Sequence, residues 1–198
     1  MVSTISERPR PALPGTAVDA VKIVIVGGLG VGKTTMVSSV SEIPPLSTEE
    51  TMTRAGIGID YTGPVAGKAT TTVAFDFGRI TLSPDLVLYL FGAPGQERFW
   101  FMWDQLFRGA LGAVVLVDTR RVADSWYAID RLEHHGTPFV VARNNFPGIR
   151  HGLGALREAL ALSDGIPLVD CDARARGSSK QVLIALLNHL QSAQENAS

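Results

Sequence analysis

The stretch Gly27–Thr34 reads Gly-Gly-Leu-Gly-Val-Gly-Lys-Thr and fits the phosphate-loop pattern G-x-x-x-x-G-K-[ST]. Glycine has no Cβ, so this backbone can approach a phosphate closely, and its successive N–H groups can face the anion. Lys33 places a positive charge on the outer phosphates, and the Thr34 hydroxyl is a ligand for Mg²⁺. We predict a phosphate-binding site formed by Gly28, Leu29, Gly30, Val31, Gly32, Lys33, Thr34 and Thr35.

The residues on both sides of this loop supply the context that the pattern requires. Val21–Val26 is almost entirely β-branched and apolar, which indicates a buried parallel strand. Met36–Val40 can continue as a helix. The loop is therefore expected between a strand and a helix, with the helix N-terminus facing the phosphates.

A second stretch, Gly92–Glu97, reads Gly-Ala-Pro-Gly-Gln-Glu and breaks the second strand after the phosphate loop. Ligands of open α/β sheets bind beyond the carboxyl ends of the strands, where this stretch falls. Gly95 offers an amide that can approach a terminal phosphate, and the Gln96 side chain can orient an attacking water. We predict that Gln96 and Lys33 are the catalytic residues.

The rest of the chain predicts an α/β domain with six strands, about five helices and a mostly parallel sheet with one antiparallel edge strand. Thr70–Ile80 and Asp85–Phe91 are joined by a connection too short for a helical crossover, so they are expected to form the antiparallel hairpin. Asp124 is the expected N-cap of one helix, and Ser178 or Ser179 that of the last helix, which should end near Gln191.

The predicted domain spans residues 21–192, between a mobile, proline-containing tail at 1–20 and a C-terminal tail at 193–198. Leu46–Ala69 has weak periodicity and reads as a long loop. Loops of this length in a compact domain are usually functional, and this one lies where a nucleotide-sensing switch is expected.

Charge, cysteine content and hydropathy bear on the partners and location expected for the protein. The formal net charge is -1, so nothing indicates a nucleic-acid-binding surface. The single cysteine excludes an internal disulfide and favours a reducing, cytoplasmic location. No apolar run approaches the ~20 residues of a membrane span, and neither end carries a lipidation motif. Any membrane association is expected to be indirect, through a partner.

Together the phosphate loop and Pro94–Glu97 resemble the small Ras-like GTPases. Leu90–Phe99 and Val73–Gly78 are more similar to the bacterial MglA-like branch, and within it to the GTPases of actinobacterial "conservon" operons. The resemblance covers about residues 22–190. It implies a Ras-like fold, GTP/GDP and Mg²⁺ as ligands, slow GTP hydrolysis, and a roadblock-domain protein and a sensor-kinase complex as partners.

The chain departs from the Ras-like pattern at its magnesium site. Ras-like proteins have Asp at the position of Gly92, where it holds Mg²⁺ through water, and MglA-like proteins lack it as well. The resemblance leaves Mg²⁺ to Thr34, the phosphates and a switch threonine, which aligns with Thr72. Thr70 and Thr71 are close rivals, and Thr51 and Thr53 lie in the same region.

The guanine-reading motif of the family, Asn-Lys-x-Asp, is also altered. Asn144 and Asn145 occupy its first positions, but Pro147 replaces the Asp that accepts hydrogen bonds from the guanine edge. Cys171, Asp172 and Ala173 align with the Ser-Ala-Lys loop, in which the alanine amide meets guanine O6. Asp172 or Asp170 could replace the missing carboxylate.

Two other functions compete with a GTPase switch. An ATP-dependent small-molecule kinase would carry an arginine-rich lid, and none is apparent. A non-hydrolysing nucleotide-binding adaptor is favoured by the changes at Gly92 and Pro147. For a GTPase, Arg54 and Arg79 are the arginines that could act in cis. The dense aromatic run Phe99–Phe107 cannot be buried on one face, so part of it is expected to be exposed or covered by a partner.

Overall fold

The computed structural model describes residues 19–44, 46–53, 70–148 and 151–195. In chain order the elements are β1 (Asp19–Val26), α1 (Lys33–Val40), β2 (Leu46–Thr53), β3 (Thr70–Ser83), β4 (Leu86–Gly92), the 3₁₀ helix η2 (Glu97–Met102), α2 (Trp103–Phe107), β5 (Gly112–Val117), the 3₁₀ helix η3 (Val122–Ser125), α3 (Trp126–His135), β6 (Phe139–Asn144), α4 (Leu153–Ala159), β7 (Leu168–Cys171) and α5 (Arg176–Glu195).

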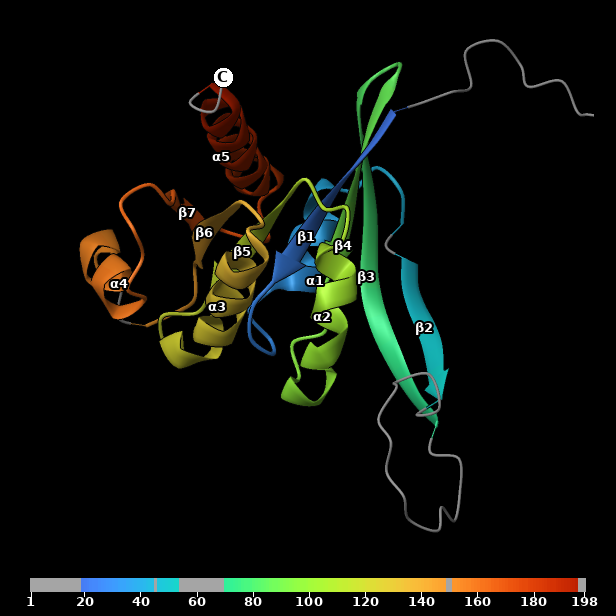
Figure 1. The fold of residues 1–198 in the computed structure, drawn as a ribbon, viewed down its shortest axis with the longest axis horizontal. Helices are drawn as coiled ribbons and strands as arrows, with labels where there is room; N and C mark the ends of the chain where they lie inside the picture. The colour runs from blue at the N-terminus through green and yellow to red at the C-terminus, as the bar shows by residue number, and fades with distance from the viewer. Residues whose placement is uncertain (1–18, 45, 54–69, 149–150, 196–198) are drawn as a thin grey trace, which may run out of the picture.

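One twisted sheet in the order β2-β3-β4-β1-β5-β6-β7 forms the centre of the domain (Figure 1). The strands β4, β1, β5, β6 and β7 pair in parallel, whereas β3 pairs antiparallel with both β4 and β2. The α/β class, the mostly parallel sheet and the β3–β4 hairpin are as predicted. The carboxyl ends of β1, β4, β5, β6 and β7 therefore meet at one edge.

Helices cover the sheet on both faces. One core lies between the sheet and the helices α1 and α5, and includes Ile23, Met36 and Leu186. The other lies between the sheet and the helices α2, α3 and α4, and includes Trp103 and Leu132. Successive side chains of β1 point to opposite faces of the sheet, so residues 23 and 25 pack in the first core and residues 24 and 26 in the second.

The predicted strand count was wrong by one. Leu46–Thr53, which we expected to be part of a long loop, forms β2 and pairs with β3 over eight positions. The antiparallel strand β3 is therefore second from the edge, and β2 is the edge strand. The rest of the expected switch loop, residues 54–69, lies outside the described residues, as does Arg54.

Several predicted boundaries and caps also differ. β1 begins at Asp19, inside the predicted tail, and α5 continues to Glu195. Asp124 is not an N-cap, because it lies within η3, and the N-cap position of α3 is Ser125. Ser178 and Ser179 are not caps either, since both lie inside α5.

The aromatic run Phe99–Phe107 divides between two cores. Phe99 and Met102 pack with Phe75 of β3, whereas Trp103 and Phe107 pack toward α3. Phe101 stays 45% exposed. The start of α2 is held in place because Trp103 Nε1 donates to the Pro94 carbonyl at 3.1 Å, and Asp104 forms an ion pair with Arg131 of α3. No helix within the described residues has the length and apolar character to cross a bilayer.

Candidate functional site

The phosphate loop lies between β1 and α1, as predicted, and its conformation depends on glycine. Gly32 has a φ of 104°, in the left-handed region, at the start of α1. A Cβ at Gly32 would also lie 2.6 Å from Asn144 Nδ2, so a side chain has no space there. Any larger residue at this position would push the loop away from Asn144.

Lys33 is buried beneath this loop. Its ammonium group donates to the carbonyls of Gly27 at 2.9 Å and Gly28 at 2.7 Å. Burial lowers the pKa of Lys33 to about 8, and the nearby Asp76 carboxylate offsets part of that shift. A phosphate in this position would supply the counter-charge that the buried ammonium lacks.

Asp76 is a site residue that we did not predict from the sequence. The Thr34 hydroxyl donates to Asp76 Oδ2 at 2.7 Å, which joins the start of α1 to β3. Asp76 lies directly opposite Gly92 in the β3–β4 register. A Cβ at Gly92 would lie 2.8 Å from Asp76 Oδ2 and 2.9 Å from Asp76 Cβ. The carboxylate that Gly92 lacks is therefore supplied from the neighbouring strand.

This pair of oxygen ligands fits a magnesium ion. Hydroxyl and carboxylate oxygens are the ligands that Mg²⁺ takes, together with water and substrate phosphates. Among the described residues, no cluster of three or more His, Cys, Asp or Glu side chains forms a metal site. An ion here would be held by one hydroxyl, one carboxylate and the nucleotide.

Thr72, the predicted switch threonine, lies on β3 opposite Thr51. It precedes Asp76 by four residues, roughly 13 Å of extended strand. The contact that the structure shows for the Thr34 hydroxyl on β3 is with Asp76. A role for Thr72 at the metal stays a prediction.

The turn after β4 closes over the phosphate loop. The Ala93 amide donates to Ile25 O at 2.8 Å, which ties the turn to the end of β1. A Cβ at Gly95 would lie 2.6 Å from Lys33 Nζ and 2.9 Å from the Gly28 carbonyl, so only glycine allows this close approach. The turn after β4 therefore lies directly beside the Lys33 ammonium group.

The loop and the turn enclose a cavity of about 440 Å³. The cavity contains the predicted catalytic residues Lys33 and Gln96 and most of the predicted phosphate ligands. It is lined by Leu29, Gly30, Gly32, Lys33, Thr34, Thr35, Asp76, Ala93, Pro94, Gly95, Gln96, Arg98 and Phe99. The predicted phosphate ligands Gly28 and Val31 are buried and do not line the cavity.

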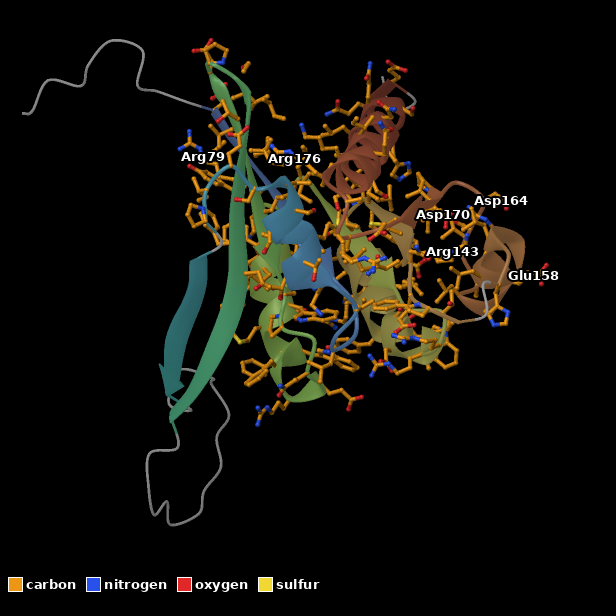
Figure 2. All side chains as sticks on the ribbon, turned by 180° about the vertical axis from the view of Figure 1, so that it is seen from behind. Arg79, Arg143, Glu158, Asp164, Asp170 and Arg176 are labelled. Carbon is orange, nitrogen blue, oxygen red and sulfur yellow. The ribbon has the colours of Figure 1, made fainter. Side chains whose placement is uncertain are left out.

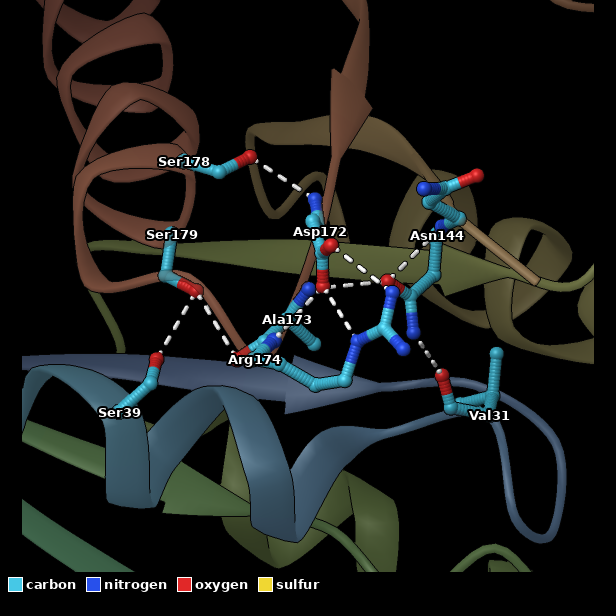
Figure 3. A network of polar contacts seen from close by, with 9 residues as sticks. Val31, Ser39, Asn144, Asp172, Ala173, Arg174, Ser178 and Ser179 are labelled. Carbon is cyan, nitrogen blue, oxygen red and sulfur yellow. Dashed lines mark hydrogen bonds and ion pairs between the residues drawn. The ribbon is translucent and has the colours of Figure 1, made fainter.

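The predicted base-binding loops meet beside the phosphate loop and are held together by Asn144 (Figure 3). Asn144 Nδ2 donates to the Val31 carbonyl at 2.9 Å, and its Oδ1 accepts from the amides of Asn145 and Ala173, both at 3.0 Å. Three segments distant in sequence are thereby fixed by one buried amide. The Ala173 amide, predicted to meet guanine O6, is bonded to Asn144 in this structure.

Serines of α5 hold the same loop from the other side. Ser178 Oγ accepts from the Asp172 amide at 2.8 Å, and Ser179 Oγ accepts from Ser39 of α1 at 2.9 Å (Figure 3). The side chain of the predicted ligand Cys171 packs in the core, and its backbone carbonyl accepts a hydrogen bond from the Asn145 amide. Burial raises the pKa of the Cys171 thiol to about 11.

The two candidate carboxylates are engaged differently. Asp170 pairs with Arg143, whose Nε donates at 2.7 Å, on the side of β6 and β7 near α4 (Figure 2). Arg174 donates two hydrogen bonds to the Asp172 carboxylate, from Nε to Oδ1 at 2.8 Å and from Nη2 to Oδ2 at 2.9 Å. Hydrogen bonding from Arg174 lowers the pKa of Asp172, and the Asn145 side chain adds to this shift. Asp172, beside Asn145, is therefore the carboxylate at the loops predicted to bind the base.

The loop after β5 contributes contacts that sequence reasoning missed. Arg121 donates to the Leu29 carbonyl and lies 3.5 Å from Asp124. A Cβ at Gly28 would lie 2.7 Å from Asp124 Cβ, so this loop packs on the outside of the phosphate loop. The position of Asp118–Arg121 at a strand end was the only sequence signal for these contacts.

A phosphate loop closed by a glycine turn, a Thr–Asp pair and an asparagine that joins the loops defines a nucleotide-binding P-loop NTPase. Over residues 25–193 the chain matches the model of a family described as "Conserved hypothetical ATP binding protein". The match covers most of the chain, so the protein belongs to this family.

Two known proteins resemble parts of this chain. Over 103 residues it is 34% identical to "Uncharacterized protein MJ1339" of Methanocaldococcus jannaschii, a match that covers 52% of this chain and 54% of that protein. The chain thus spans about half the length of this relative. The FeoB G-domain from Methanococcus jannaschii has a similar fold, with a TM-score of 0.56, 16% identity, and coverage of 88% of this chain and 99% of that chain. This likeness confirms the predicted P-loop fold.

Proposed function

We propose that this protein is a molecular switch that binds GTP and GDP with Mg²⁺ and hydrolyses GTP slowly. The close approach of Gly95 to Lys33 carries the proposal. A γ-phosphate held by Lys33 must sit against the turn after β4, whereas a diphosphate leaves that contact unmade. Binding of the terminal phosphate would therefore shift the turn, and with it η2 and α2, which follow the turn directly in the chain.

Gln96 lines the cavity beside this contact, and we propose that its side chain orients the attacking water. The water oxygen attacks the γ-phosphorus, and the bond from that phosphorus to the β–γ bridging oxygen breaks. The electron pair of that bond stays on GDP, and the proton of the water leaves with the released phosphate. Mg²⁺, held by Thr34 and Asp76, would neutralise charge on the β- and γ-phosphate oxygens.

The preference for guanine is supported by the arrangement of the base-binding loops. An ionised carboxylate can accept from the two N–H groups on the edge of guanine, whereas adenine has only one such donor group there. Asp172 is the carboxylate at these loops and is a candidate for this role. Its bonds to Arg174 orient it and also compete for its oxygens.

The alternative functions are a nucleotide-binding adaptor with little or no hydrolysis and an ATP-dependent small-molecule kinase. The observation that favours them is the exposed Pro147, which cannot accept hydrogen bonds from a base, and the family description names ATP. Titration calorimetry with GTP, GDP and ATP, each with and without Mg²⁺, separates the alternatives. A switch should bind GTP and GDP more tightly than ATP, and more tightly with Mg²⁺. Preferential binding of ATP would contradict the proposal.

The partners are proposed from the resemblance: a roadblock-domain protein, within a sensor-kinase-associated system. The surface we assign to them is the exposed part of η2, where Phe101 stays uncovered beside the nucleotide-sensing turn. Pull-down of a roadblock-domain protein should depend on the bound nucleotide and weaken on Phe101→Ala. Capture that is indifferent to both would contradict this assignment.

A further inference from the structure

We propose that Arg98 is a built-in catalytic cation that contacts the γ-phosphate during hydrolysis. The proposal rests on the proposed GTPase function and adds a residue to its site. Arg98 is the second residue of η2 and lies two positions after Gln96. It lines the same cavity as Lys33 and Gln96, on the side formed by the turn after β4.

The charges around the cavity favour this role. During phosphoryl transfer, negative charge spreads over the oxygens of the transferred group, and an arginine that meets it accelerates the reaction strongly. Among the described residues that line the cavity, Lys33 and Arg98 are the cations and Asp76 is the carboxylate. Lys33 belongs to the phosphate loop and the start of α1, and Arg98 belongs to η2, so two separate elements bring a cation to the same cavity.

The Arg98 guanidinium is free to take this position. Within the described part of the chain, the guanidinium contacts the Phe99 ring, and its Cζ lies 4.7 Å from the ring centroid. It makes no hydrogen bond or ion pair there. Exchanging this ring contact for a charge-assisted contact with a phosphate is therefore favourable.

The backbone around Arg98 is anchored on both sides. Ala93 and Phe99 are 2% and 7% exposed, whereas Glu97 and Arg98 between them are exposed. The side chain can thus reorient without disturbing the core. Because the Arg98 side chain is not fixed on the cavity in the free protein, turnover should stay slow until a partner holds this side chain against the phosphate.

Among the described residues, two further arginines, Arg79 and Arg121, are unsuited to act in cis. The Arg79 amide donates to Ser41 Oγ and its carbonyl accepts from the Glu42 amide, so Arg79 lies at the C-terminal end of α1, away from the phosphate loop. Arg121 is occupied by the Leu29 carbonyl and Asp124.

The proposed contact changes no bond of its own. When the bond to the β–γ bridging oxygen breaks and its electron pair passes to GDP, the guanidinium donates hydrogen bonds to the γ-phosphate oxygens. It stays protonated throughout, because its charge is what stabilises the transition state.

The test compares the wild-type protein with Arg98→Ala and Arg98→Lys, using exposed Arg108→Ala as a matched loss of charge outside the cavity. Single-turnover GTP hydrolysis, GDP affinity and formation of a complex with GDP and aluminium fluoride are measured for each. We expect Arg98→Ala to slow hydrolysis about tenfold or more and to lose the aluminium fluoride complex, with GDP affinity within about twofold of wild type. Arg98→Lys should lower the hydrolysis rate less than Arg98→Ala, and Arg108→Ala should leave the rate unchanged.

Hydrolysis by Arg98→Ala at the wild-type rate, with the aluminium fluoride complex retained, would overturn the role of Arg98 and leave the proposed function standing. A wild-type protein that neither binds nor hydrolyses GTP overturns the proposed function itself, and this role with it. An equal loss in Arg98→Ala and Arg108→Ala also overturns the assignment, because it would reflect net charge alone.

Discussion

Asp76 and Gly92 face one another across the β3–β4 pair, and the carboxylate of Asp76 fills the space that a side chain at Gly92 would need. The two positions are therefore alternatives for one acidic group next to Thr34. In this structure the carboxylate next to Thr34 comes from Asp76 on β3, and position 92 on β4 carries no side chain.

This relationship predicts the outcome of exchanging the two residues. Gly92→Asp alone should be destabilising, because its Cβ would meet Asp76 at 2.8 Å. Asp76→Gly alone should weaken the Mg²⁺ dependence of nucleotide affinity. The double variant should recover both properties in part, since one carboxylate then remains. Thermal unfolding and nucleotide titrations over a range of Mg²⁺ concentrations measure the two effects. Additive losses in the double variant would contradict the exchange.

Lys33→Ala should weaken nucleotide binding while the domain stays folded. The substitution removes a charge-assisted contact worth about 1.5–3 kcal/mol, or roughly 10- to 150-fold in affinity. Fluorescent nucleotide titration gives the affinity, and circular dichroism provides the control for folding. Undiminished affinity in a folded variant would show that the phosphates bind elsewhere.

The base-binding loops predict modest nucleotide discrimination in the wild-type protein. Pro147→Asp should raise the ratio of GTP to ATP affinity, because it restores a carboxylate at the base-reading position. Asp172→Asn should lower the ratio if Asp172 contacts the base. Competition titrations determine both ratios. A wild-type preference above about 10⁴-fold, unchanged in Asp172→Asn, would mean that another residue reads the base.

Intrinsic GTP hydrolysis should be on the order of 10⁻³ s⁻¹ or slower. Gln96→Leu should slow it further without changing GDP affinity, because Gln96 is proposed to position only the water. Single-turnover measurements with radiolabelled GTP resolve rates in this range. Rapid turnover by the isolated protein, or an unchanged rate in Gln96→Leu, would rule out this mechanism.

Cys171 should behave as an inert thiol with a stability effect at alkaline pH. Its pKa is raised by burial from 9.0 to about 11, so the folded state favours the protonated thiol. The resulting stability is fully present below pH 9 and is lost as the pH rises toward 11. Alkylation at pH 8 should therefore require unfolding, and Cys171→Ala should flatten the decline in melting temperature above pH 9. Rapid alkylation of the native protein would contradict this expectation.

The sequence alone determined the parts of the site that depend on neighbouring residues. The phosphate loop, the strand before it and the helix after it are contiguous, so glycine spacing and a β-branched run were enough to place Lys33 and Thr34. The hairpin could be predicted because a short connection permits only antiparallel pairing. The strand Leu46–Thr53 could not, because its polar sequence forms a strand only when β3 pairs with it.

The tertiary structure decided which distant side chains complete the site. Asp76 faces Gly92 because the β3–β4 register shifts between Thr81 and Ser83. Without that irregularity the pairing would slip by one residue, and such a slip turns every side chain to the opposite face of the sheet. Arg121 and Asp124 likewise reach the phosphate loop only because β5 lies beside β1. Contacts of this kind depend on strand order and register, which arise from the packing of the whole chain rather than from any local run of residues.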